Sequence, residues 1–84
     1  MEKTRVVLIG VIVGDDAAVE RINDIFHEYR RYIIGRLGIP YKERDISIIS
    51  ITVDAPQAVI SAISGKLGMI DHVSSKTIYA KVPE

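Results

Sequence analysis

The sequence contains no cysteine and has no excess of charge of either sign. The absence of cysteine excludes disulfide bonds and thiolate metal sites. It is also compatible with the cytoplasm, where we expect the protein to act. Eleven basic residues balance eleven acidic ones, so the formal net charge is zero and no overall field attracts a phosphate backbone. We therefore expect no direct binding to nucleic acid.

Long hydrophobic runs are also missing. The N-terminal segment MEKTRVVLIG has a short lead of mixed charge and an apolar run far below membrane-spanning length, with Gly14, Asp15 and Asp16 soon after it. We expect neither a membrane segment nor a targeting sequence. Residues 1–84 are predicted to form a single domain, which would bury only about 60–65% of its unfolded surface. Since disulfides are excluded, the cheapest additional burial comes from another copy of the chain.

Hydrophobic periodicity divides the chain into four strands and two helices. The strands are predicted at residues 5–13, 32–38, 46–53 and 75–82, and the helices at residues 16–29 and 56–68. Asp15 or Asp16 is placed to cap the first helix. Asp54 and Pro56 open the second helix, which turns Val59, Ile63 and Leu67 inward. It ends near Gly68, where a left-handed cap is expected.

The two halves of the chain follow the same pattern. VVLIGVIVGDDAAV aligns with ISIISITVDAPQAV as a strand, an acidic turn and a helix that opens on small residues. Each half is a split βαβ unit, and right-handed crossovers fold two such units into one sheet. The predicted fold is α+β, a ferredoxin-like βαββαβ sandwich with a four-stranded antiparallel sheet of order 4-1-3-2 and both helices on one face.

The first strand carries apolar residues on both of its sides, although two helices cover only one face of the sheet. We expect the uncovered face to form the contact between subunits, because monomeric proteins rarely expose large apolar patches to solvent. The predicted contact residues are Val6, Leu8, Ile12, Ile46, Ile48, Ile78 and Ala80. The predicted assembly is a homodimer or homotetramer, joined face to face or edge to edge.

The stretch YIIGRLGIPY places Gly35, Arg36 and Gly38 inside a predicted strand, and GIPYKERD is expected to be the connection that follows. Glycine in a strand permits a bulge or a close backbone approach, which would set Arg36 beside a partner or a ligand. The alternative is that the glycines only bend the strand and that Arg36 is solvated. Lys66 and Gly68 follow the second helix, and with the first three residues they form the predicted ligand-binding set.

Residues with catalytic or metal-binding chemistry are few. His27 lies one turn after Asp24 on the polar face of the first helix and is expected to be solvated, as is His72 in a turn. Asp15, Asp16 and Asp54 end neighbouring strands and could converge at one edge, but helix capping accounts for each of them. Phosphate loops and nucleophile elbows are absent. We expect no catalytic residue, no metal site and no cofactor.

Three segments, YIIGRLGIPY, ISIISITVDAPQAVISAISGKLG and VSSKTIYAKV, give the chain a family resemblance. It resembles the iron-only hydrogenase system regulators over almost its whole length. The resemblance implies an ACT-like domain similar to the C-terminal domain of nickel-responsive repressors. Such domains generally associate through their sheets and bind small effectors, often amino acids, at subunit interfaces. This chain lacks the histidine and cysteine nickel site of the repressors and their DNA-binding segment.

Two hypotheses follow. In the first, the protein is a non-enzymatic ACT-like regulatory domain that forms a homo-oligomer and senses a small molecule. In the second, it is an assembly module without a ligand, and it binds a regulatory or maturation protein through Ser61 and Ser64 on the second helix.

Overall fold

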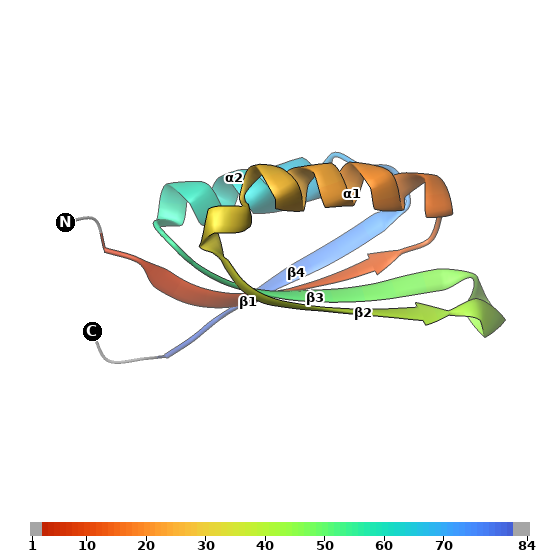
Figure 1. Ribbon diagram of the computed structural model, residues 1–84, viewed down its shortest axis with the longest axis horizontal. Helices are drawn as coiled ribbons and strands as arrows, with labels where there is room; N and C mark the ends of the chain where they lie inside the picture. The colour runs from red at the N-terminus through yellow and green to blue at the C-terminus, as the bar shows by residue number, and fades with distance from the viewer. Residues whose placement is uncertain (1–2, 82–84) are drawn as a thin grey trace.

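A computed structural model describes residues 3–81, in which two helices cover one face of a four-stranded sheet (Figure 1). The elements are β1 (Arg5–Val13), α1 (Asp16–Glu28), β2 (Ile33–Tyr41), β3 (Ile46–Ala55), α2 (Gln57–Gly68) and β4 (Val73–Tyr79), with short 3₁₀ turns η1 (Arg30–Tyr32) and η2 (Lys42–Arg44). All three strand pairs are antiparallel, and the sheet order is β2-β3-β1-β4. This order is 4-1-3-2 in reverse, so the predicted ferredoxin-like fold is confirmed.

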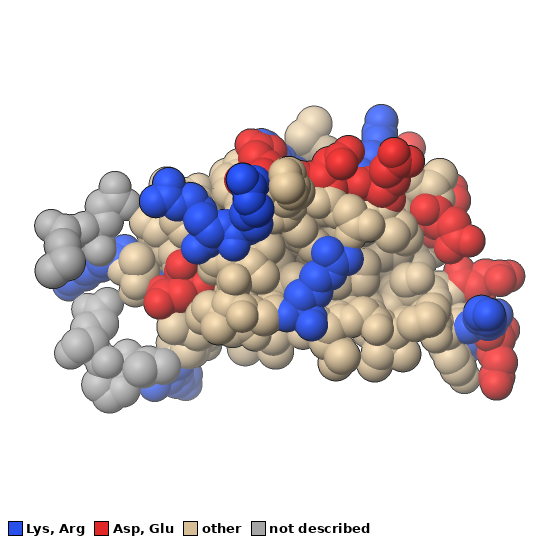
Figure 2. Space-filling view, in the orientation of Figure 1, with Lys and Arg blue, Asp and Glu red and all other residues tan. Residues whose placement is uncertain are grey.

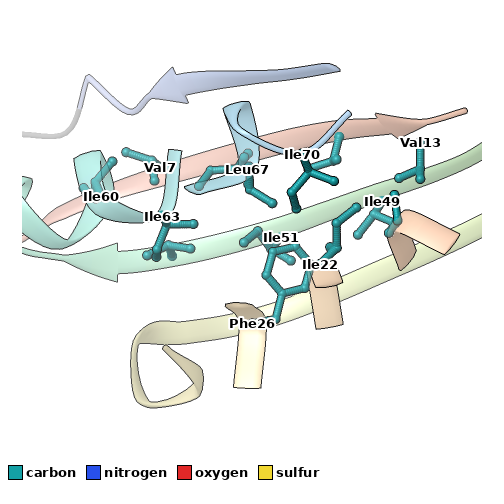
Figure 3. Packing of buried hydrophobic residues seen from close by; sticks show 14 of the residues in the cluster. Val7, Val13, Ile22, Phe26, Ile49, Ile51, Ile60, Ile63, Leu67 and Ile70 are labelled. Atoms are coloured by element: carbon teal, nitrogen blue, oxygen red, sulfur yellow. The ribbon is translucent and has the colours of Figure 1, made fainter. Parts of the chain in front are cut away.

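The core lies between the helices and the covered face of the sheet (Figure 3). β1 is central because it pairs with β3 on one side and β4 on the other, and its residues alternate between buried and exposed. Successive strand residues point to opposite faces, so every second residue of β1 enters the core. The buried side chains are Val7, Ile9, Val11, Val13, Ala18, Ile22, Phe26, Ile49, Ile51, Val53, Ala55, Ile60, Ile63, Leu67 and Ile70.

The ends of the two helices differ in part from the prediction. Asp15 caps α1, since its Oδ1 accepts a hydrogen bond of 3.0 Å from the Ala17 amide. α2 buries Ile60 in addition to Ile63 and Leu67, whereas Val59 is only half-buried. The predicted left-handed cap at Gly68 is wrong, because no glycine of the described chain has a positive φ. The helix passes through Met69 in a right-handed conformation instead, which carries Ile70 into the core.

β2 is longer than the sequence predicted. It continues through Gly38 to Tyr41, so GIPY belongs to the strand and the connection to β3 is only η2 and Asp45. Pro40 is tolerated because β2 is an edge strand with one neighbour. At the other edge β4 runs from Val73 to Tyr79, and the predicted end at Val82 lies outside the described residues. Within residues 3–81 no helix has the length and apolar character needed to cross a bilayer.

Candidate functional site

The uncovered side of the sheet, which we call the open face, carries most of the exposed apolar side chains of the described chain. Strand register brings together side chains from all four strands on this side. Leu8 of β1 lies between Thr52 and Ile78, and Ile12 lies next to Ile48. Its large apolar members are Val6, Leu8, Ile12, Leu37, Ile39, Tyr41, Ile48 and Ile78, each between 38% and 64% exposed.

The open face has a polar strip across its middle. Gly10 of β1 pairs with Ser50 on one side and with Lys76 on the other. A Cβ added at Gly10 would meet no atom within 4 Å, so the centre of the sheet is bare backbone. The strip separates apolar side chains at the start of β1 from those at its end. Near the start, Val6, Thr52 and Ile78 line a shallow hollow of about 150 Å³.

Five of the seven predicted contact residues are exposed on the open face: Val6, Leu8, Ile12, Ile48 and Ile78. Ile46 is half-buried, and Ala80 is exposed just beyond β4, where its amide donates to the Val6 carbonyl at 3.0 Å. Their role in subunit contacts stays a prediction. Sequence reasoning missed Leu37 although it lies in the predicted strand, and it missed Ile39 and Tyr41 because GIPYKERD was taken for a connection. The signal was present as apolar residues at every second position.

The predicted ligand-binding residues of β2 lie on both sides of the sheet. Gly35 pairs with Thr52 and faces the open side, whereas Arg36 pairs with Ile51 and Gly38 with Ile49, so both face the helices. The Arg36 guanidinium donates through Nη2 to Oδ1 of Asn23 on α1. Its Cζ atom also lies 5.1 Å from the centroid of the Phe26 ring.

Lys66 and Gly68 lie elsewhere, on α2. Lys66 Nζ is 2.9 Å and 3.1 Å from the two carboxylate oxygens of Glu28 and 4.9 Å from the centroid of the Tyr29 ring. Contacts with Tyr29 and Glu28 raise the pKa of Lys66 above its ordinary value. Lys66 therefore joins α2 to the end of α1, while Arg36 joins β2 to the middle of α1. The structure does not gather the five residues around one cavity, and their binding role stays a prediction.

The three aspartates do not converge at one edge of the sheet. Asp15 and Asp16 follow the end of β1, whereas Asp54 pairs with Val6 near its beginning. The strands are antiparallel, so the end of β3 lies beside the start of β1 and the expected convergence is wrong. Among residues 3–81 no three histidine, cysteine, aspartate or glutamate side chains are grouped so that they could hold a metal ion.

Comparison with known protein families places nearly the whole chain in one family. Residues 5–77 match the TM1266-like family, described as "Iron-only hydrogenase system regulator, putative". The solved structure of the uncharacterized protein TM1266 from Thermotoga maritima superimposes with a TM-score of 0.90 at 30% sequence identity. This match covers 94% of the present chain and 100% of the other. No curated protein sequence matches the chain.

Two more distant structures share the fold alone. A formyltetrahydrofolate deformylase from Pseudomonas putida KT2440 matches with a TM-score of 0.63 at 6% identity, over 87% of this chain and 28% of that one. The divalent ion tolerance protein CutA1 from Ehrlichia chaffeensis matches with a TM-score of 0.51 at 15% identity, over 96% and 86% of the two chains.

Proposed function

Because this chain belongs to the TM1266-like family of iron-only hydrogenase system regulators, we propose that it is a non-enzymatic regulatory domain that acts as a homo-oligomer and responds to a small ligand. The observation that carries the proposal is the open face. A second copy of the same chain is the simplest partner for it, since one two-fold contact covers the apolar surface of both copies.

The composition of the open face supports a subunit contact. Aliphatic side chains and one tyrosine make up its exposed apolar part, and Lys76 is the charged residue of its central strip. Interfaces between identical subunits are similarly rich in apolar side chains. The bare backbone at Gly10 would allow a partner side chain to approach the middle of the sheet closely.

The ligand response is proposed from the resemblance to ACT-like domains and from Arg36. A guanidinium held by Asn23 and Phe26 keeps several of its five N–H donors available to an anion. Ligand binding to such a domain would then stabilise the folded or assembled state by mass action.

Two measurements test the proposal. Sedimentation velocity should show reversible association of the full chain, and a thermal-shift screen of amino acids, nucleotides and other small anions should identify a stabilising compound. A compound at 100 times its dissociation constant adds about 2.7 kcal/mol to the free energy of unfolding. A chain that stays monomeric at high micromolar concentration would remove the basis of the proposal.

A second candidate is the assembly module, and the outer surface of α2 favours it. Ala58, Ser61 and Gly65 are exposed along this helix, and Met69 at its end is 84% exposed. Small side chains with little charge allow another protein to approach the helix closely. If no small molecule shifts the melting temperature while Ser61→Arg abolishes binding to a purified hydrogenase-system protein, this second function is the better one.

A further inference from the structure

A groove separates the second half of α1 from the edge strand β2, on the opposite side of the sheet from the open face. It has a volume of about 340 Å³, within the range of small-molecule sites. Asn23, Phe26 and His27 of α1, Arg30 of η1, and Ile33 and Arg36 of β2 line it. Three consecutive elements thus contribute to one concave surface.

The groove contains two guanidinium groups and no carboxylate. Arg30 donates through Nη1 to the His27 carbonyl at 2.8 Å, and Arg36 donates to the Asn23 amide oxygen. Both acceptors are uncharged, and in the described chain neither arginine forms an ion pair with aspartate or glutamate. Figure 2 shows basic side chains over η1 and between α1 and β2, whereas most acidic side chains on this face lie along α1 and at the far end of the β2–β3 hairpin. Neither guanidinium is therefore paired directly with a carboxylate in the described part of the chain.

The base of the groove is apolar, and its side chains pack against the hydrophobic core. Phe26 is almost fully buried, and its ring supports the Arg36 guanidinium at 5.1 Å. A cation–π contact of this length, together with the hydrogen bond to Asn23, holds the Arg36 guanidinium at the groove. Ile33 is half-buried beside the core and offers apolar surface that a ligand can reach. This combination suits a ligand with an anionic end and an apolar body.

We infer that this groove binds a small organic anion, whose carboxylate or phosphate group lies between Arg30 and Arg36 and whose apolar part rests on Ile33. Arginine matches the planar oxygen pair of these groups with two parallel hydrogen bonds. The inference rests on the proposed function for its regulatory meaning, because the bound anion would be the signal. The proposed ligand is an organic anion that binds on the helix side of the sheet.

An NMR titration of the ¹⁵N-labelled full chain tests this site with benzoate, phenyl phosphate, inorganic phosphate and uncharged benzamide. We expect benzoate or phenyl phosphate to shift the amides of Asn23, Ile33 and Arg36 saturably, and benzamide to shift none of them. Comparing the two acids tells whether the anionic group is preferred as carboxylate or phosphate. Arg30→Ala or Arg36→Ala should weaken binding about tenfold or more, since each removes charged hydrogen bonds.

Arg31→Ala is the matched control. Arg31 carries the same charge and lies next to Arg30, but it stacks on Tyr32 at 5.3 Å and does not line the groove. Its loss should leave benzoate affinity unchanged. Arg30→Ala leaves the stack on Phe26 intact, so it tests the site even if Arg36→Ala impairs folding.

Three results would overturn the inference: no saturable shift with either organic anion, equal affinity for inorganic phosphate and phenyl phosphate, or equal loss of affinity in Arg31→Ala. Sedimentation of the same variants separates this test from that of the proposed function. Arg30→Ala and Arg36→Ala should associate like the wild type, and a chain made monomeric through the open face should still bind benzoate.

Discussion

Leu8→Glu should convert an associating chain into a folded monomer. Leu8 is 42% exposed near the centre of the open face, between Thr52 and Ile78. The exposed fractions of the eight large apolar side chains of this face add to roughly four fully exposed side chains. At about 1.5–3 kcal/mol for each fully buried side chain, covering them yields about 6–12 kcal/mol per chain.

The same magnitudes give the expected affinity. Two chains together gain about 12–24 kcal/mol, whereas association costs about 4–15 kcal/mol in lost freedom. At the midpoints of both ranges the net free energy of association is roughly 8 kcal/mol in favour of the dimer, which corresponds to a Kd of about 1 µM. A buried, unpaired carboxylate costs several kcal/mol per ion, and a two-fold contact buries two of them. Leu8→Glu should therefore weaken association by a factor of about a thousand or more.

Sedimentation velocity over the micromolar range measures this change directly. Ala58→Glu is the matched control, because Ala58 is exposed in the first turn of α2, where a negative charge is favourable. It should sediment like the wild type. The Leu8 side chain points away from the core, so circular dichroism should show that Leu8→Glu is folded. If Leu8→Glu and the wild type have the same sedimentation coefficient at every concentration, the open face is not the contact and the reasoning fails.

Three further predictions concern stability and are checked by urea unfolding at low protein concentration. Ile63 is fully buried, so Ile63→Ala should lower the free energy of unfolding by about 2–5 kcal/mol. Ile34 is exposed, so Ile34→Ala should change it by less than about 0.5 kcal/mol. Equal losses in the two variants would contradict the burial pattern. Asp15→Ala should lower the free energy of unfolding by about 1 kcal/mol because it removes the cap of α1, whereas Asp15→Asn should keep most of the wild-type stability. An equal loss of stability in both variants would point to charge instead of capping. Because the pKa of Lys66 is raised in the folded chain, its contribution to the free energy of unfolding is complete below the ordinary lysine pKa and is lost as the pH rises through the raised value. The wild type should therefore be slightly more stable than Lys66→Met, and this difference should vanish at strongly alkaline pH. A difference that persists there would refute the role of the charge.

The sequence predicted the central position of β1 from its near-continuous apolar run, and it predicted the sheet order from the two split βαβ halves of the chain. It did not predict the orientation of β2. An extra residue at Ile34 creates a bulge, so Ile33 pairs with Val53 but Gly35 pairs with Thr52 on the opposite face. The bulge sets which residues after it face the helices, and Arg36 thereby reaches α1. Glycines signal that a bulge is possible but not which residue it takes up.

The groove was missed for a related reason. Arg30 was not singled out in the sequence, since an arginine at the end of a helix is usually solvated. Its approach to Arg36 depends on η1, a single tight turn that directs the chain from α1 into β2. Neither periodicity nor composition specifies such a turn. Two positive charges were visible in the sequence, but their common cavity was not.

The two borders of the sheet have a consequence for how large an assembly can grow. Pro40 interrupts the row of backbone donors on β2, the bulge at Ile34 twists the same strand, and Lys76 adds a charge to β4. A strand of a neighbouring molecule would therefore pair poorly with either edge strand, which disfavours the growth of a continuous intermolecular sheet. If the chain associates through the open face, as proposed, its assembly would close at a fixed size and would not extend sideways through the sheet borders.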